Sequence, residues 1–235
     1  MGYETEAYKE AIRWSKSLEK RSSIIQRSSK RLQSSINERI PDRVHSIVTE
    51  SVRKMIELAL TSSKYIRPID IDETLTFKER EDLVKQRLQE YKGAASWEGA
   101  GTGFGGFWLG AADFPLLLSI KMKFLFDSAQ YYGFNVNEYE ERVYLLHIFM
   151  LAFSSDEERV KVRDILLDWE AAPPERKEID WKTLQIEYRD TIDLAKLFQL
   201  VPGFGAIVGY VANKRFLEQL GETTMNAYRL RMLKN

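Results

Sequence analysis

The chain has no cysteine and only two histidines among its 235 residues. The lack of cysteine excludes disulfides, thiolate metal sites and cysteine nucleophiles, and it fits a reducing compartment. No Ser-His-Asp set or HExxH motif is visible, and His45 and His147 are too far apart in the sequence to form a helical metal pair. His147, in YLLHIFML, is expected to face the core. We therefore expect no metal and no cofactor, and the absence of a catalytic motif favours a non-enzymatic role.

A signal peptide and a long apolar run are also missing. Residues 1–20 contain no apolar stretch of signal-peptide length, so we expect a cytoplasmic protein. Two charge-free runs, 99–112 and 197–213, have 14 and 17 residues. A helix that spans a bilayer needs about 20 mostly apolar residues. Buried helices, re-entrant segments or shallow insertions therefore fit these runs better than stable spans.

Strand patterns are almost absent, and helix signals dominate. Ala11, Leu18, Ile25 and Leu32 recur every seven residues and predict one helix over about 4–37. Further helices are predicted from about Pro41 to Ser62 and over about 77–92, 114–132, 137–153, 155–170, 181–199 and the C-terminal end, with a connector at 67–75 and a break at 171–180. The sequence predicts an all-α fold: a single multi-helix domain over 1–235, with two glycine-rich apolar helical segments packed centrally.

Local signals mark several of the predicted helix ends. Thr76-x-x-Glu79 and Ser155-x-x-Glu158 have the pattern of a capping box, and Asn137, three residues before Glu140, is expected to cap the helix that follows it. Gly133 is placed to end the preceding helix. The acidic residues 156–158 lie where the helix dipole favours negative charge.

Net charge is zero but unevenly distributed. Residues 1–67 hold 14 Lys or Arg against eight Asp or Glu, an excess of +6, and form basic amphipathic helices. Such an excess indicates an anionic partner, either a membrane surface, nucleic acid or an acidic protein. The candidates for membrane-surface contact are Lys20, Arg21, Arg27, Lys30 and Arg31. The alternative is a solvated face on a packed helix. A nucleic-acid role ranks below both, because few aromatic residues lie among these charges.

The glycine-rich segments can be interpreted in two ways. Gly101-x-Gly103-x-x-Gly106 has the outline of a dinucleotide loop, but no strand precedes it and no Lys-Ser or Lys-Thr pair follows it. Glycines one helical turn apart instead allow two helix backbones to approach closely. The candidates for ligand binding or close helix packing are Gly101, Gly103, Gly105, Gly106, Gly110, Asp113, Pro115, Gly203, Gly205, Gly209 and Asn213.

Two polar residues in these segments remain open to a functional role. Asp113 lies between apolar neighbours just before Pro115, as expected for an N-cap, or for a buried carboxylate with a raised pKa. Asn213 ends an apolar run and has the same ambiguity. Arg229 and Arg231 are expected to be a solvated helix end.

The stretches GAGTGFGGFWLGAADFPLLLSIKMKFLFDSAQYYGF (99–134) and LVPGFGAIVGYVANKRFLEQLGETTMNAYRLRML (200–233) resemble the bacterial EcsC family. The resemblance covers most of residues 90–235, whereas the N-terminal third matches only in general helical character. This family is named for a component encoded beside the subunits of an ABC transporter and has no established activity. The resemblance therefore implies a link to membrane transport and no reaction.

Two functions of different classes follow. The first is an accessory factor of an ABC transport system, associated peripherally with the inner face of the cell membrane, whose partners are the membrane surface or transporter subunits. The second is a soluble enzyme or small-ligand-binding protein, with a pocket lined by the glycine-rich segments and Asp113.

Overall fold

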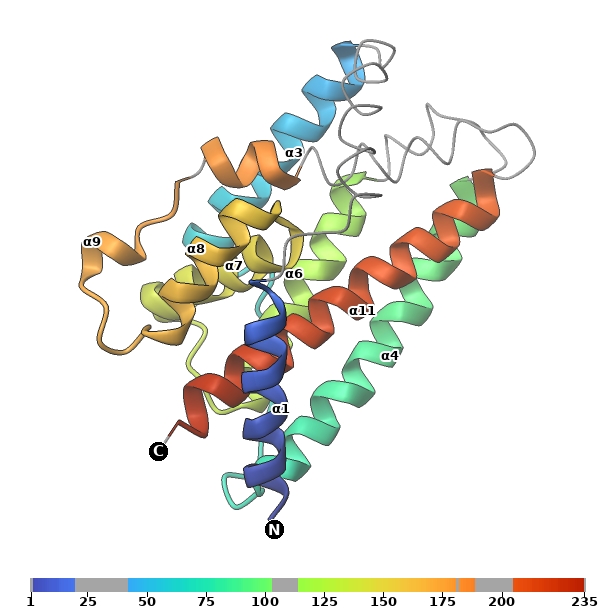
Figure 1. The fold of residues 1–235 in the computed structure, drawn as a ribbon. Helices are drawn as coiled ribbons and strands as arrows, with labels where there is room; N and C mark the ends of the chain where they lie inside the picture. The colour runs from blue at the N-terminus through green and yellow to red at the C-terminus, as the bar shows by residue number, and fades with distance from the viewer. Residues whose placement is uncertain (1, 20–41, 103–113, 181, 189–204, 235) are drawn as a thin grey trace.

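The computed structural model describes residues 2–19, 42–102, 114–180, 182–188 and 205–234. Every regular element in these ranges is helical, so the all-α prediction is confirmed (Figure 1). The labelled helices are α1 (Tyr3–Ser17), α3 (Asp42–Thr61), α4 (Phe77–Thr102), α6 (Phe114–Tyr131), α7 (Tyr139–Phe153), α8 (Asp156–Leu167), α9 (Pro174–Lys177) and α11 (Gly205–Met232). Residues 182–188 form a further helical stretch.

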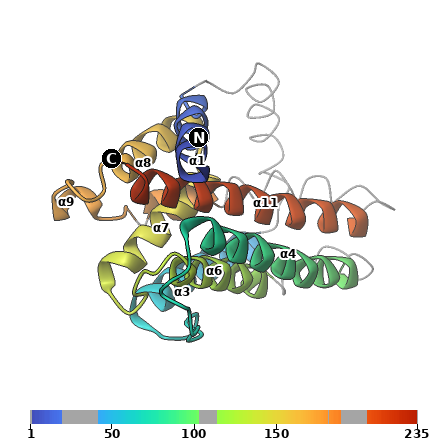
Figure 2. The same cartoon turned by 90° about the horizontal axis from the view of Figure 1, so that it is seen from below.

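The long helices α4 and α11 lie antiparallel and side by side (Figures 1 and 2). Glu81 of α4 contacts Arg229 of α11, and Lys92 of α4 contacts Glu218 of α11. Residue numbers therefore rise along α4 in the direction in which they fall along α11. Gly221 of α11 meets Leu88 of α4 between these contacts, where a Cβ atom would overlap the leucine side chain. The two helices thus approach closely at a residue without a side chain. The sequence predicts this role for glycines, but Gly221 is not among the candidates that it indicates.

Helix α7 is enclosed on nearly every side. All of its residues from Glu141 to Phe153 are buried, as expected of a helix that is apolar around its circumference. It packs against α3, α6, α8 and α11, and Phe149 and Phe153 contact Tyr188 from the 182–188 helix. The centre of the described core is therefore α7. Central packing of the glycine-rich segments stays a prediction, because most of their residues lie outside the described ranges.

Two of the local signals work as predicted. Thr76 and Glu79 form a capping box: the Thr76 N–H donates to Glu79 Oε2 at 2.8 Å, and the Glu79 N–H donates to Thr76 Oγ1 at 3.3 Å. Gly133 ends α6 with a φ of 91°. Its N–H donates to Gln130 O, and the Phe134 N–H donates to Ala129 O. These two bonds form a Schellman motif, which favours glycine at this position.

Two other predicted caps are wrong, because Asn137 lies in a local turn and Ser155 binds a residue from another segment. Glu138, and not Asn137, precedes the first residue of α7, and the Asn137 N–H donates to Asn135 Oδ1 in a turn. Ser155 does precede α8, but its N–H and hydroxyl both donate to the Glu187 carboxylate, at 2.5 and 3.1 Å. Glu158, the expected partner of Ser155, is bound by Lys161 instead.

The first helix also ends earlier than the heptad pattern predicts. Helix α1 stops at Ser17, and Leu18 and Glu19 form a turn. The Ser17 hydroxyl donates to the Trp14 carbonyl at 2.6 Å, a local bond that competes with the helix. The remainder of the predicted 4–37 helix lies outside the described ranges.

Three helix ends meet at one end of the bundle (Figures 1 and 2). Helix α4 ends there at Thr102, α6 begins there at Phe114, and α11 begins there at Gly205. We call this the glycine end. Both glycine-rich runs therefore join the bundle at the same end, although they are far apart in the sequence.

Candidate functional site

A hollow lined by charged side chains lies between α4, α6 and the connector that follows α3. It has a volume of about 450 Å³, within the usual range for ligand sites. We call it the cationic pocket, and it is lined by Lys64, Tyr65, Ile66, Arg67, Arg87, Glu90, Tyr91, Lys123 and Asp127. Four of these side chains are cations and two are carboxylates, so the pocket has an excess of positive charge.

The connector that carries Lys64 and Arg67 is held by hydrogen bonds to α4 and α6, and its Ile69 N–H donates to Gln130 Oε1 of α6 at 3.3 Å. Arg80 donates to Leu75 O and Glu73 O in the connector and to Tyr131 O at the end of α6, at 3.1 to 3.2 Å. These bonds fix the connector against α4 and α6. They therefore position the pocket's rim although the connector has no regular structure.

Arg87 pairs with both carboxylates of the pocket, although the buried Asp127 Oδ1 has no hydrogen-bond partner among the described residues. Its Nε donates to Asp127 Oδ2 at 2.7 Å, and its Nη1 donates to Glu90 Oε2 at 2.5 Å. The Tyr91 hydroxyl donates to the same Asp127 oxygen at 2.9 Å. Burial lowers the pKa of Arg87, but the hydrogen bonds to Glu90 and Asp127 outweigh it and raise the pKa above its ordinary value. Burial beside Asp127 raises the pKa of Tyr91, so this phenol stays protonated.

The other three cations of the pocket, Lys64, Arg67 and Lys123, have exposed side chains. Within the described part of the chain, no carboxylate lies within 4 Å of the side-chain nitrogens of Lys64, Arg67 or Lys123. Arg67 is near enough to Glu90 to lower the pKa of that carboxyl, though without direct contact. Because Arg87 already binds both carboxylates, these exposed cations can bind an external anion. An oxyanion such as a phosphate matches this donor set.

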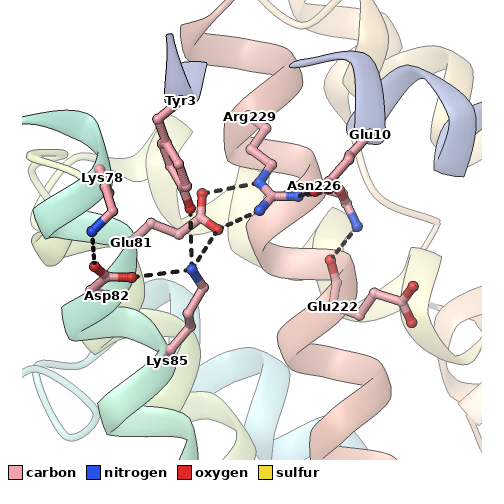
Figure 3. A network of polar contacts seen from close by, with 9 residues as sticks. All are labelled: Tyr3, Glu10, Lys78, Glu81, Asp82, Lys85, Glu222, Asn226 and Arg229. Carbon is pink, nitrogen blue, oxygen red and sulfur yellow. Dashed lines mark hydrogen bonds and ion pairs between the residues drawn. The ribbon is translucent and has the colours of Figure 1, made fainter. Parts of the chain in front are cut away.

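A second charged cluster joins α1, α4 and α11 (Figure 3). Glu81 is fully buried, and Arg229 binds its two oxygens at 2.5 and 3.0 Å. Lys85 lies 3.4 Å from the same carboxylate, and Arg229 also binds Glu10 of α1. The cluster links the first and last of the described helices. We therefore infer that this cluster stabilises the fold.

Arg231, two residues further on, belongs to a similar cluster. Its Nη1 lies 2.6 Å from the buried Glu141 carboxylate, which also accepts a hydrogen bond from the Tyr228 hydroxyl. Burial raises the pKa of Glu141, and Arg231 opposes that rise. The side chains of Arg229 and Arg231 are only 12% and 10% exposed, so the prediction of a solvated helix end is wrong. Both side chains turn inward because buried carboxylates on α4 and α7 bind them.

Two further ionisable groups lie in the core. His147 is buried, as predicted, and its Nδ1 donates to the Val143 carbonyl at 3.0 Å. Burial lowers the pKa of His147 to about 4. Lys121 is buried without an ion pair in the described part of the chain, with its ammonium 5.8 Å from the Phe216 ring centre. Burial lowers the pKa of Lys121 to about 8.

Only some of the candidate residues proposed from the sequence lie in the described part of the chain. Gly101 lies in α4, Gly205, Gly209 and Asn213 lie in α11, and Pro115 is an exposed residue in the first turn of α6. The following candidates lie outside the described residues: Gly103, Gly105, Gly106, Gly110, Asp113, Gly203, Lys20, Arg21, Arg27, Lys30 and Arg31. The proposed roles of all these residues stay predictions.

Sequence reasoning missed the cationic pocket. The only signal was the presence of Lys123 and Asp127 in the otherwise apolar 114–132 segment, which marks a helix face that meets something polar. Among the described residues, no cluster of His, Asp and Glu is suited to a metal ion. None of the described helices is both long and apolar enough to cross a membrane.

Comparisons with known proteins agree with the sequence resemblance and extend it. The EcsC protein family model matches residues 5–233, which adds the N-terminal third to the region of similarity. The chain is 47% identical to Protein EcsC of Bacillus subtilis (strain 168) over 225 residues, which cover 96% of this chain and 94% of that protein. It is also 36% identical to the uncharacterized protein YdbA of the same strain over 147 residues, covering 60% of this chain and 53% of that protein. No solved structure shows significant similarity. The chain is a member of the EcsC protein family.

Proposed function

We propose that this EcsC-family protein is a peripheral membrane-associated accessory factor of an ABC transport system. In this proposal, the glycine end of the bundle meets the bilayer or a membrane subunit of the transporter. The link to transport comes from the family resemblance.

One observation carries the proposal: the two glycine-rich, charge-free runs adjoin the same end of the bundle. The first run leads from α4 to α6, and the second leads into α11. Apolar residues gathered at one end of a helical protein are typical of a surface that docks on a membrane or a partner. Leu116, in the first turn of α6, adds an apolar side chain that is 47% exposed.

The basic N-terminal third supplies the second element of the proposal. Its excess of +6 would be attracted to anionic headgroups. Shallow apolar insertion combined with electrostatic attraction is enough for reversible membrane binding without a spanning helix.

Co-sedimentation with vesicles of phosphatidylglycerol and phosphatidylcholine tests the proposal. We expect binding at low salt that weakens as salt rises. The variant K20E/K30E/R31E should bind less than the matched control K161E/K182E/R176E, which has the same change in net charge. No binding at low salt, or an equal loss in both variants, would overturn membrane association. Affinity capture from native membranes should also enrich an ABC ATPase and its membrane subunit, and their absence would remove the transport link.

A further inference from the structure

We infer that the cationic pocket and an adjoining apolar groove form one binding site for an anionic phospholipid. The pocket would hold the phosphate group, and the groove would hold part of an acyl chain. The inference does not depend on membrane docking by the glycine end, because a lipid presented as a monomer would bind the same site.

The groove lies between α3 and α6 and has a volume of about 580 Å³. Its apolar lining is Met55, Leu58, Tyr65, Pro115 and Leu118, with Ile47 at one side. Lys64 and Tyr65 line both the groove and the cationic pocket, so the two hollows adjoin. A charged compartment joined to an apolar one matches a ligand that is itself amphiphilic.

The charges at the edge of the groove also favour an anion. Glu50 lines the groove, but Arg53 binds its carboxylate through two hydrogen bonds of 2.6 and 3.0 Å. Lys54 and Lys64 line the same hollow as cations. The acidic side chains in both hollows are therefore already paired with arginines, whereas no carboxylate of the described residues pairs with the exposed cations of the pocket.

Tyr65 lines both hollows. The Tyr65 ring packs on Phe126, with 6.0 Å between ring centres. Burial raises the pKa of Tyr65, against the effect of a hydrogen bond with Ser119. Tyr65 thus stays a neutral donor, suited to the ester oxygens between a headgroup and its acyl chain.

The direction of the groove fits the entry of a lipid. Pro115 belongs to the first turn of α6, so the groove reaches the glycine end. A free phosphate would occupy only the cationic pocket and would make no contact with the apolar lining of the groove. For this reason we assign the site to a phospholipid and not to a soluble phosphate compound.

Isothermal titration with monomeric dihexanoyl phosphatidylglycerol tests the inference. We expect wild-type protein to bind this lipid at least about tenfold more tightly than dihexanoyl phosphatidylcholine, and more tightly than glycerol 3-phosphate. Two variants should each weaken binding about tenfold. R67Q/K123Q removes two unpaired cations, and Ser51→Trp fills the groove that Ser51 lines.

Two matched variants serve as controls. R176Q/K182Q removes one exposed arginine and one exposed lysine outside both hollows, and Ser17→Trp places the same bulk on α1. Both should bind like wild type, and circular dichroism should show unchanged helix content in all four variants. Equal affinity for the two lipids, or no effect of R67Q/K123Q, would overturn the inference. If glycerol 3-phosphate binds as tightly as the lipid, the groove contributes nothing and the phospholipid assignment is wrong.

Discussion

The Arg229 guanidinium binds both oxygens of the fully buried Glu81 carboxylate across the contact between α11 and α4. Replacing Arg229 with Gln would leave a buried carboxylate whose remaining ion pair among the described residues is with Lys85, at 3.4 Å. We expect the free energy of unfolding, measured by urea denaturation, to fall by about 3 kcal/mol. The double variant E81Q/R229Q should recover part of this loss because it removes the buried charge.

An exposed ion pair provides the comparison for this prediction. Arg13 lies 3.2 Å from Glu6 on the surface of α1. Arg13→Gln should cost no more than about 0.5 kcal/mol, since such pairs contribute little. If Arg229→Gln is equally mild, the buried pair does not hold α4 and α11 together.

Gly221 and Gly93 are both helical, but their surroundings predict opposite effects of substitution. A side chain at 221 would collide with Leu88, whereas a Cβ at 93 would have no atom within 4 Å. Gly221→Leu should therefore lower the free energy of unfolding by about 1–3 kcal/mol through overpacking. Gly93→Ala should raise it by about 0.5–1 kcal/mol, because alanine is the better helix former. An unchanged melting temperature for Gly221→Leu would contradict the close contact between Gly221 and Leu88.

The register of α4 on α11 also makes a prediction about the glycine-rich segments. Glu81 meets Arg229 and Lys92 meets Glu218, so the same register, continued by seven residues on each helix, would bring Gly99 opposite Val211 on the facing sides. The chain has no cysteine, so G99C/V211C should form a disulfide on mild oxidation without competing thiols. The G93C/V211C pair is displaced by about 9 Å along the helix and should not form one. Equal cross-linking in both variants, or none in the first, would contradict the continuation of this register into the glycine-rich segments.

His147 should make stability depend on pH. Its pKa is about 4 in the folded protein against 6.5 as the ordinary value, because burial disfavours the charged ring. Between these pH values the unfolded chain binds the additional proton, so the stability from neutral His147 is lost as pH falls from about 6.5 to 4. The loss should total roughly 3 kcal/mol. The difference in unfolding free energy between wild type and His147→Gln should follow this change, and a difference independent of pH would contradict it.

The sequence predicted those features that depend on neighbours in the chain. The Thr76 capping box, the Gly133 stop and the buried position of His147 each follow from residues within a few positions of them. Helical periodicity likewise placed most of the helices, and the glycine and Ala-Asp-Phe-Pro motifs identified the family. Local signals failed at Ser155, because its partner Glu187 comes from 32 residues away.

The candidate site could not be predicted because it is assembled from distant segments. Arg87 binds Asp127 from 40 residues away, and the connector that carries Lys64 and Arg67 is bonded to α6 through Ile69 and Gln130, which are 61 residues apart. The prediction of a solvated Arg229 failed for the same reason, since its partner Glu81 lies 148 residues earlier. A charged residue on a helix has the same sequence pattern whether it faces water or a buried carboxylate. Only the packing of the helices decides between them.

Fluorescence of single labels tests most directly whether the glycine end meets the membrane. A cysteine introduced at Leu116 would carry an environment-sensitive dye near the start of α6, where the side chain is 47% exposed. A cysteine at Tyr139, 64% exposed, would carry the same dye beyond the opposite end of that helix. With anionic vesicles, we predict a blue shift and protection from aqueous quenchers for the label at 116 and neither change for the label at 139. An unchanged spectrum at 116, or equal shifts at both positions, would contradict the account.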